Sequence, residues 1–160
     1  MKIVGIDNGF NGGLVCIEDG RVIGKLTMPV IDLDTGKHAY DIPFIIQSFE
    51  SWQPDLAILE KAQPYPKQGG VSNYSIGLGY GIMQGILSAL KIPFEVVHPK
   101  TWQKLIFAGL PHEDTKAASA LFCQRRWPTV DWRATERCKK VHDGLTDAAC
   151  MCEYGFRIRG

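Results

Sequence analysis

Two stretches of the chain, Ile3-Val4-Gly5-Ile6-Asp7 and Leu56-Ala57-Ile58-Leu59-Glu60, each run through four apolar residues and end on an acid. Short uninterrupted apolar runs are typical of strands that are buried on both faces of a parallel sheet. Neighbouring strands lie about 5 Å apart, so acids at their carboxyl ends would meet at one edge. Two anions so close repel each other, and a divalent cation removes that repulsion. The repeated pattern therefore predicts a metal site.

The first of these stretches opens an antiparallel meander. The strands that the sequence predicts cover residues 2–7, 13–18 and 21–28, with turn residues between them. Apolar positions at helical spacing then predict a crossover helix over residues 38–52, in which Pro43 is tolerable only in the first turn. A strand that follows a crossover runs parallel to the strand before it, so Asp7 and Glu60 are expected at a common edge.

The second half of the chain adds one more strand and several helices. The strand is expected over residues 94–97, and the helices over 72–90, 100–107, 113–126 and about 142–154. We therefore expect an α/β protein with a mixed sheet, three antiparallel strands plus two parallel strands, flanked by helices. This order matches the ribonuclease H-like fold.

Length and composition favour one soluble domain over residues 1–160. Apolar residues make up 45% of the chain, and no apolar run is long enough to span a membrane. The sequence begins directly in a strand, without the pattern of a secretory signal. The five cysteines are an odd number without a Cys-x-x-Cys pair, which favours reduced thiols. We expect a cytoplasmic protein, in the host cytoplasm if the chain is viral, with no membrane partner.

The charges are unevenly distributed although the formal net charge is only +1. Residues 1–99 hold seven Lys/Arg against ten Asp/Glu, whereas residues 100–140 hold nine against four, a balance of +5. If several acids bind a divalent metal, they no longer count against an anionic ligand. The basic segment is either a surface for an anionic partner or simply a solvated face.

A third source of acids lies near the end of the chain. Asp143 and Asp147 are four residues apart and so share one face of the last predicted helix. The small residues Gly144, Ala148 and Ala149 would let this helix approach a sheet closely, which would carry both acids toward the common edge. Four carboxylates are ligands of the kind that suits Mg²⁺ or Mn²⁺. Each acid also has a structural interpretation, as a turn residue, an ion-pair partner or a helix cap.

Short motifs follow one another along the whole chain: Gly5-Ile6-Asp7-Asn8-Gly9 with Gly12-Gly13, Leu59-Glu60-Lys61 with Pro66-Lys67-Gln68-Gly69, Val97-x-Pro99-x-x-Trp102-x-Lys104, Lys116-x-x-Ser119, and His142-Asp143-Gly144-x-x-Asp147-Ala148. Together they resemble the RuvC family of Holliday junction resolvases, especially its bacteriophage branch. The resemblance implies a ribonuclease H-like fold, a homodimer, and Mg²⁺-dependent nicking of symmetric strands at a four-way DNA junction.

The resemblance also implies roles for individual residues. Asp7 would bridge two metal ions, Mg²⁺ or Mn²⁺, Glu60 would be the second ligand, and Asp147 would be the final acid on the helix. The fourth ligand in this family lies three or four residues before the last Asp, which makes Asp143 our choice and His142 the fallback. Asn8 stands where the family commonly has Pro, and we expect it to alter the turn more than the chemistry.

Other residues are candidates for contact with DNA. Tyr65, on the loop after Glu60, could stack on an unpaired base at the crossover or pack against its neighbouring prolines. The candidates for phosphate contacts, which position DNA without reading its sequence, are Lys67, Lys100, Lys104, Lys116, Arg133, Arg137, Lys139 and Lys140. Lys104 and Lys116 come first, because they fall within matched motifs.

The helix over residues 72–90 leaves two alternatives open. Gly77, Gly81 and Gly85 form a stripe on this helix, which predicts close approach of either another element of this chain or a second subunit.

Three rival functions also remain open. They are a ribonuclease H acting on RNA–DNA hybrids, an actin-like nucleotide-binding protein, and a non-catalytic DNA-binding module. The actin-like alternative needs roughly twice this chain length and leaves Glu60 and the acids of the last helix unexplained.

Overall fold

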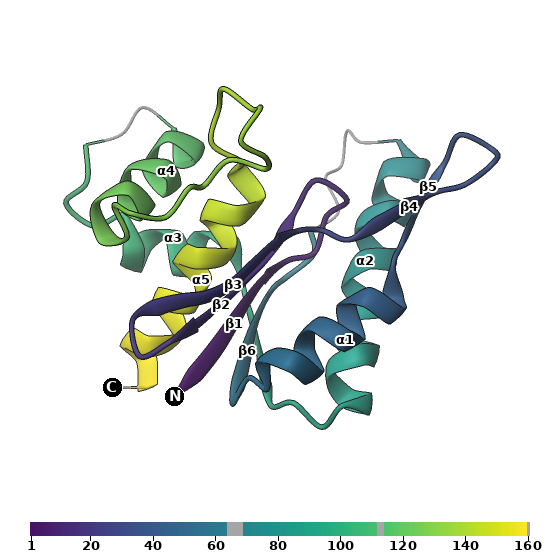
Figure 1. The fold of residues 1–160 in the computed structure, drawn as a ribbon, viewed down its shortest axis with the longest axis horizontal. Helices are drawn as coiled ribbons and strands as arrows, with labels where there is room; N and C mark the ends of the chain where they lie inside the picture. Colours follow the sequence, from purple (N-terminus) through teal and green to yellow (C-terminus); the bar gives the residue numbers. More distant parts are fainter. Residues whose placement is uncertain (64–68, 112–113, 160) are drawn as a thin grey trace.

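A mixed five-stranded sheet forms the centre of the molecule (Figure 1). The computed structural model describes residues 1–63, 69–111 and 114–159. The strands lie in the order β3-β2-β1-β6-β7, and their bounds are Lys2–Asp7 for β1, Gly13–Glu18 for β2, Arg21–Thr27 for β3, Leu56–Glu60 for β6 and Phe94–Val97 for β7. β1, β2 and β3 pair antiparallel, whereas β6 is parallel to β1 and β7 is parallel to β6. The predicted α/β, ribonuclease H-like sheet is confirmed.

Helices cover both faces of this sheet, which is why its strands are apolar on both sides. On one face lie α1 (Ile42–Trp52) and α2 (Gly70–Ala89), and on the other lie α3 (Pro99–Ile106), α4 (Thr115–Arg126) and α5 (Asp143–Arg159) (Figure 1). Ile3 and Ile58 belong to the core under α5, whereas Val4 and Leu59 belong to the core under α1 and α2. No helix within the described ranges has the length and apolar character needed to cross a membrane.

The predicted helix over residues 38–52 is wrong at its start. β5 (His38–Tyr40) is a short strand that pairs antiparallel with β4 (Val30–Asp32), and α1 begins only at Ile42. The Asp41 side chain caps the helix by accepting a hydrogen bond from the Phe44 N–H at 3.1 Å. A helix started at residue 38 would have placed Pro43 beyond the first turn, where its ring clashes with the preceding turn.

α5 lies directly on the backbone of β1 and β2. A methyl group at Gly5 would lie 1.9 Å from the carbonyl oxygen of Ala148, and one at Gly144 would lie 2.6 Å from the Cα atom of Gly12. Contacts this short leave no room for a side chain at either position. The prediction that small residues let this helix approach the sheet closely is therefore confirmed.

The glycine stripe of α2 separates the two alternatives that the sequence left open. Methyl groups at Gly77, Gly81 and Gly85 would meet nothing within 4 Å among the described residues. The close approach occurs at Gly79, where a methyl group would lie 2.2 Å from the Tyr40 hydroxyl oxygen. Of the two explanations for the stripe, packing within this chain is not observed in the described ranges, and the stripe lies on an open face of α2.

Candidate functional site

Asp7 and Glu60 end neighbouring parallel strands at the same edge of the sheet. Ile6 of β1 pairs with Leu59 of β6, so the two acids follow side by side. Burial raises the pKa of Asp7 to about 6, although the hydrogen bond that its carboxylate accepts from the Gly9 N–H lowers this pKa. Burial, reinforced by the neighbouring charge of Asp7, raises the pKa of Glu60 to about 8. The two strand-end acids therefore occupy a poorly solvated site in which their charges oppose each other.

Asp147 joins them from the first part of α5. Burial raises its pKa to about 7, the hydrogen bond from the Ser119 hydroxyl lowers it, and the charges of Asp7 and Asp143 raise it further. The charge of Asp147 in turn contributes to the raised pKa of Glu60. The close packing of Gly144 on Gly12 places this part of the helix against the β1–β2 turn.

Two depressions meet at Asp7. One, of about 220 Å³, is lined by Asp7, Glu60 and the residues that follow each of them. The other, of about 440 Å³, is lined by Asp7 together with Asp143, Asp147 and Lys116. Ile76 of α2 borders both depressions. Asp7 is thus the acid that lines both depressions, and its expected role as a bridging metal ligand stays a prediction.

The donor chemistry of these carboxylates fits a divalent metal with oxygen ligands. Burial raises the pKa values of Asp7, Glu60 and Asp147 because their charged forms are poorly solvated, and a divalent cation would stabilise those charged forms. Within the ranges that the structure covers, no three Asp, Glu, His or Cys side chains already form a cage ready to hold an ion. The acids lie at one edge of the sheet, but their side chains are not arranged around a common point.

The structure separates the two candidates for the fourth ligand. Asp143 lines the larger depression and raises the pKa of Asp7, and its carboxylate forms an ion pair with the Lys116 ammonium at 2.9 Å. His142 instead sits at the start of α5, where its Nδ1 accepts a hydrogen bond from the Leu145 N–H at 3.3 Å. Asp143 therefore lies beside the other acids, whereas one ring nitrogen of His142 is engaged in helix capping; which of the two would hold a metal stays a prediction.

Three residues that support the acids were not assigned roles from the sequence. The Asn8 amide donates to the Glu60 carbonyl oxygen at 2.7 Å and ties the ends of β1 and β6 together. Ser119, fully buried on α4, hydrogen-bonds the Asp147 carboxylate, and the indole N–H of Trp102 reaches Glu60 Oε1 at 3.4 Å. Ser119 and Trp102 stand in the short motifs of the resemblance, which was the available signal. For Asn8 the sequence predicted an effect on the turn more than on the chemistry, and did not predict its bond to the end of β6.

The predicted DNA contacts divide into three groups: those outside the described residues, those on α3 and α4 near the acids, and those on the loop between α4 and α5. Tyr65 and Lys67 lie outside the described residues. Lys100 and Lys104 are exposed on α3 and line a depression of about 340 Å³ that also includes Thr115 at the start of α4. Lys116 borders the acids directly. Lys100 directly follows Pro99, which lines the smaller acid depression, and Thr115 directly precedes Lys116, which lines the larger one.

The third group lies on the loop between α4 and α5. Arg137, Lys139 and Lys140 are exposed, and none of them forms an ion pair within the described part of the chain. Arg133, which the sequence also suggested as a phosphate contact, is instead engaged inside the loop. Its guanidinium forms an ion pair with Asp131 at 2.7 Å. Basic character alone does not distinguish Arg133 from the other three residues.

No family model matches the sequence, and no curated protein matches it either. The structure is nevertheless similar to Thermus thermophilus RuvC in complex with Holliday junction substrate, with a TM-score of 0.65 and 15% identity over 99% of this chain and 96% of that chain. A second T. thermophilus RuvC structure gives a TM-score of 0.61 and 16% identity, over 99% and 97% of the two chains. The yeast mitochondrial Holliday junction resolvase gives 0.54 and 11%, over 94% and 75%. The chain therefore has a RuvC-like, ribonuclease H-like fold.

Proposed function

We propose that this protein is a metal-dependent, structure-selective DNA endonuclease that resolves four-way junctions by paired symmetric nicks. The observation that carries the proposal is the convergence of Asp7, Glu60 and Asp147, from β1, β6 and α5, on one edge of a RuvC-like fold. The similar structure from T. thermophilus is described as a complex with a Holliday junction. Exposed basic residues on α3 and on the α4–α5 loop give the same side of the chain its affinity for an anionic polymer.

The proposed cofactor is Mg²⁺, with Mn²⁺ as a possible substitute, at two ions per site. Asp7 would be the shared ligand, with Glu60 on one side and Asp143 and Asp147 on the other. Such ions, when bound, activate water and stabilise the leaving oxygen in phosphodiester hydrolysis. The chain itself keeps the ligands in place: Asn8 fixes the end of β6 through its bond to the Glu60 carbonyl, and Ser119 orients the Asp147 carboxylate.

Lys116 has two partners in this proposal. Its ammonium pairs with the Asp143 carboxylate, and that hydrogen bond raises the pKa of Lys116. Both side chains are well exposed, so the pair is weak and can be exchanged. When DNA binds, Lys116 is placed to contact a phosphate, which would free Asp143 for the metal. Lys100 and Lys104 would hold the neighbouring phosphates in the adjoining depression.

We also propose that the protein acts as a homodimer through α2. Paired nicks need two active sites, and α2 presents an uncovered face with the glycine stripe and the exposed side chains of Val71, Tyr74 and Leu78. Exposed apolar surface of this kind is typical of a protein interface. The bacteriophage branch and a cytoplasmic location, in the host if viral, remain predictions from the sequence.

The test uses labelled four-way junctions, three-way junctions, flaps and RNA–DNA hybrids with Mg²⁺. The wild-type protein should nick the four-way junction at two symmetric positions, and the Asp7→Asn variant should bind it without cutting. Cleavage of the hybrid alone would favour a ribonuclease H. Undiminished cleavage by Asp7→Asn would exclude the proposed site, and a monomeric mass at micromolar concentration would exclude the dimer.

A further inference from the structure

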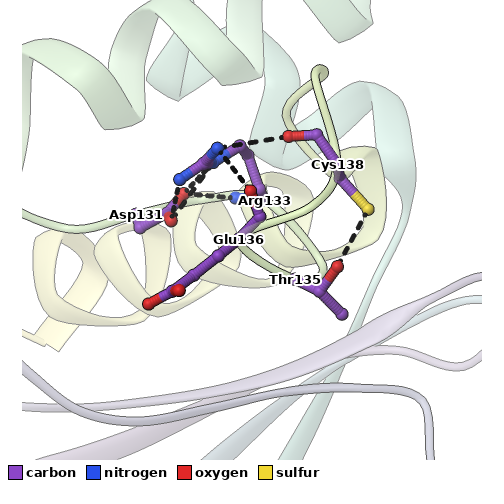
Figure 2. Close-up of polar contacts among 5 residues, drawn as sticks. All are labelled: Asp131, Arg133, Thr135, Glu136 and Cys138. Atoms are coloured by element: carbon purple, nitrogen blue, oxygen red, sulfur yellow. Dashed lines mark hydrogen bonds and ion pairs between the residues drawn. The ribbon is translucent and has the colours of Figure 1, made fainter.

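The loop between α4 and α5 is organised around a single arginine, Arg133 (Figure 2). Its guanidinium Nε donates to both carboxylate oxygens of Asp131, at 2.9 and 3.2 Å, and one terminal nitrogen donates to Asp131 Oδ2 at 2.7 Å. The other terminal nitrogen donates to the carbonyl oxygens of Glu136 at 2.9 Å and Cys138 at 3.3 Å. We call this set of contacts the Arg133 clasp.

The clasp closes a loop that is also pinned at its base. Arg133 and Val141 form an isolated antiparallel bridge, and the His142 N–H donates to the Trp132 carbonyl oxygen at 2.8 Å. Within the loop, the Cys138 N–H donates to the Thr135 carbonyl oxygen at 3.0 Å. Residues 134–140 are therefore held where the loop begins and ends, and two of their carbonyl oxygens, those of Glu136 and Cys138, accept hydrogen bonds from the Arg133 guanidinium.

The tip of this loop carries cations and no aromatic group. Arg137, Lys139 and Lys140 are exposed, against one acid, Glu136. Without an aromatic side chain the tip has no platform on which a base could stack. Exposed ammonium and guanidinium groups instead suit the phosphate backbone, which they contact without reading sequence. The loop leads within three residues into Asp143, the first residue of α5.

We propose that Arg133 is a positioning residue whose clasp holds residues 134–140 as a preformed arm for the DNA backbone beside the acid site. This inference rests on the proposed function. The planar guanidinium is required because its donors engage the carboxylate and two carbonyl groups at the same time, which an ammonium on a lysine stem does not do. A preformed arm binds more tightly because less conformational freedom is lost on contact with DNA.

The experiment measures binding of a four-way junction over a series of salt concentrations, in the uncut Asp7→Asn background. Replacing Arg137, Lys139 and Lys140 together by alanine should reduce the magnitude of the negative slope of log K against log[salt] by about 2 to 3, since each phosphate contact contributes about −0.9. Arg133→Lys keeps the charge yet should reduce the magnitude of this slope by about 2 and weaken binding about tenfold at physiological salt, because the unrestrained residues no longer make those contacts. Adding it to the triple variant should cause no further loss.

Arg157→Lys is the matched control, because Arg157 also pairs with a carboxylate, Glu153 at 3.2 Å, and donates to a carbonyl oxygen, Leu105 at 3.3 Å. It should bind as the parent does. A second readout needs no DNA: trypsin should cut after the loop cations about tenfold faster in Arg133→Lys, because the clasp no longer restrains the chain.

Normal binding and normal trypsin resistance in Arg133→Lys would overturn the inference. An equal loss from Arg133→Lys in the parent and in the triple variant would also overturn it, since Arg133 would then contact DNA itself. A wild-type protein that binds junctions without cutting them would overturn only the proposed nuclease. A wild-type protein that binds no branched or duplex DNA would overturn both.

Discussion

The two long helices α5 and α2 lie on opposite faces of the sheet and use glycine in opposite ways (Figure 1). On α5, Gly144 lies against the backbone of the β1–β2 turn, and Gly5 of β1 lies against the Ala148 carbonyl group of the same helix. On α2, Gly77 and Gly81 have no neighbour within 4 Å of an added methyl group among the described residues. Exposed or packed, glycine on a helix therefore indicates that another backbone can approach closely, but it does not identify the element or molecule that approaches. The contact on α5 places acids at the sheet edge, whereas the stripe on α2 remains available to a second molecule.

The largest effect is expected on the α5 side, where the chemistry is proposed. Asp147→Asn should lower the rate of junction cleavage by at least about a thousandfold, because a metal ligand is lost. Ser119→Ala should cost about 10- to 100-fold, as is usual for a group that orients a ligand. Single-turnover cleavage with Mg²⁺ measures both rates. Equal rates for Ser119→Ala and wild type would show that Ser119 serves only packing.

The second prediction contrasts the two glycine contacts directly. Gly5→Ala should destabilise the fold by about 3 kcal/mol or more, because the added methyl group would overlap the Ala148 carbonyl oxygen. Gly85→Ala on α2 should instead stabilise the protomer by up to about 1 kcal/mol, since alanine favours helix and nothing obstructs it. Denaturant unfolding compares the two. Similar losses in both variants would remove the distinction between the faces.

The third prediction concerns pH and the acids that α5 and the strands bring together. The pKa values of Asp7, Glu60 and Asp147 are raised to between about 6 and about 8, above their values in an unfolded chain. The folded protein then binds more protons than the unfolded chain, so this contribution to stability is complete below about pH 4 and is lost as pH rises through 8.

Thermal unfolding of the metal-free protein should therefore show lower stability at pH 8.5 than at pH 5, by several kcal/mol. Mg²⁺ should restore the loss at the higher pH, and Asp7→Asn should reduce the dependence because one interacting charge is gone. A flat profile between these pH values would mean that the pKa values of these acids are not raised in the folded protein.

The smallest effect is expected at the open face of α2. Gly81→Ala should weaken self-association about fivefold, because a methyl group at an interface built on small residues separates the two surfaces. Analytical ultracentrifugation over a range of concentrations measures this change. Lys25→Ala, a substitution on β3 remote from α2, is the control. Unchanged association in Gly81→Ala would assign the interface to another surface.

Local sequence was sufficient for much of this fold and site. Uninterrupted apolar runs predicted β1 and β6 with their terminal acids, and the four-residue spacing of Asp143 and Asp147 placed both on α5. The failed prediction at residues 38–40 shows the limit of periodicity. His38–Tyr40 is too short to distinguish a strand from a helix turn, and pairing with residues 30–32 decided between them.

Long-range contacts decided what the local pattern could not. Asn8 and Ser119 act on acids that lie 52 and 28 residues away in the chain, and no local signal announces such a partner. Arg133 and Arg137 are two arginines of the same loop, yet Arg133 is hydrogen-bonded to a carbonyl group of that loop and Arg137 is exposed. The sequence determined which elements form and which acids end them, because those depend on neighbouring residues. Only the tertiary structure decided which charges are compensated, because this depends on burial and on partners brought together by the fold.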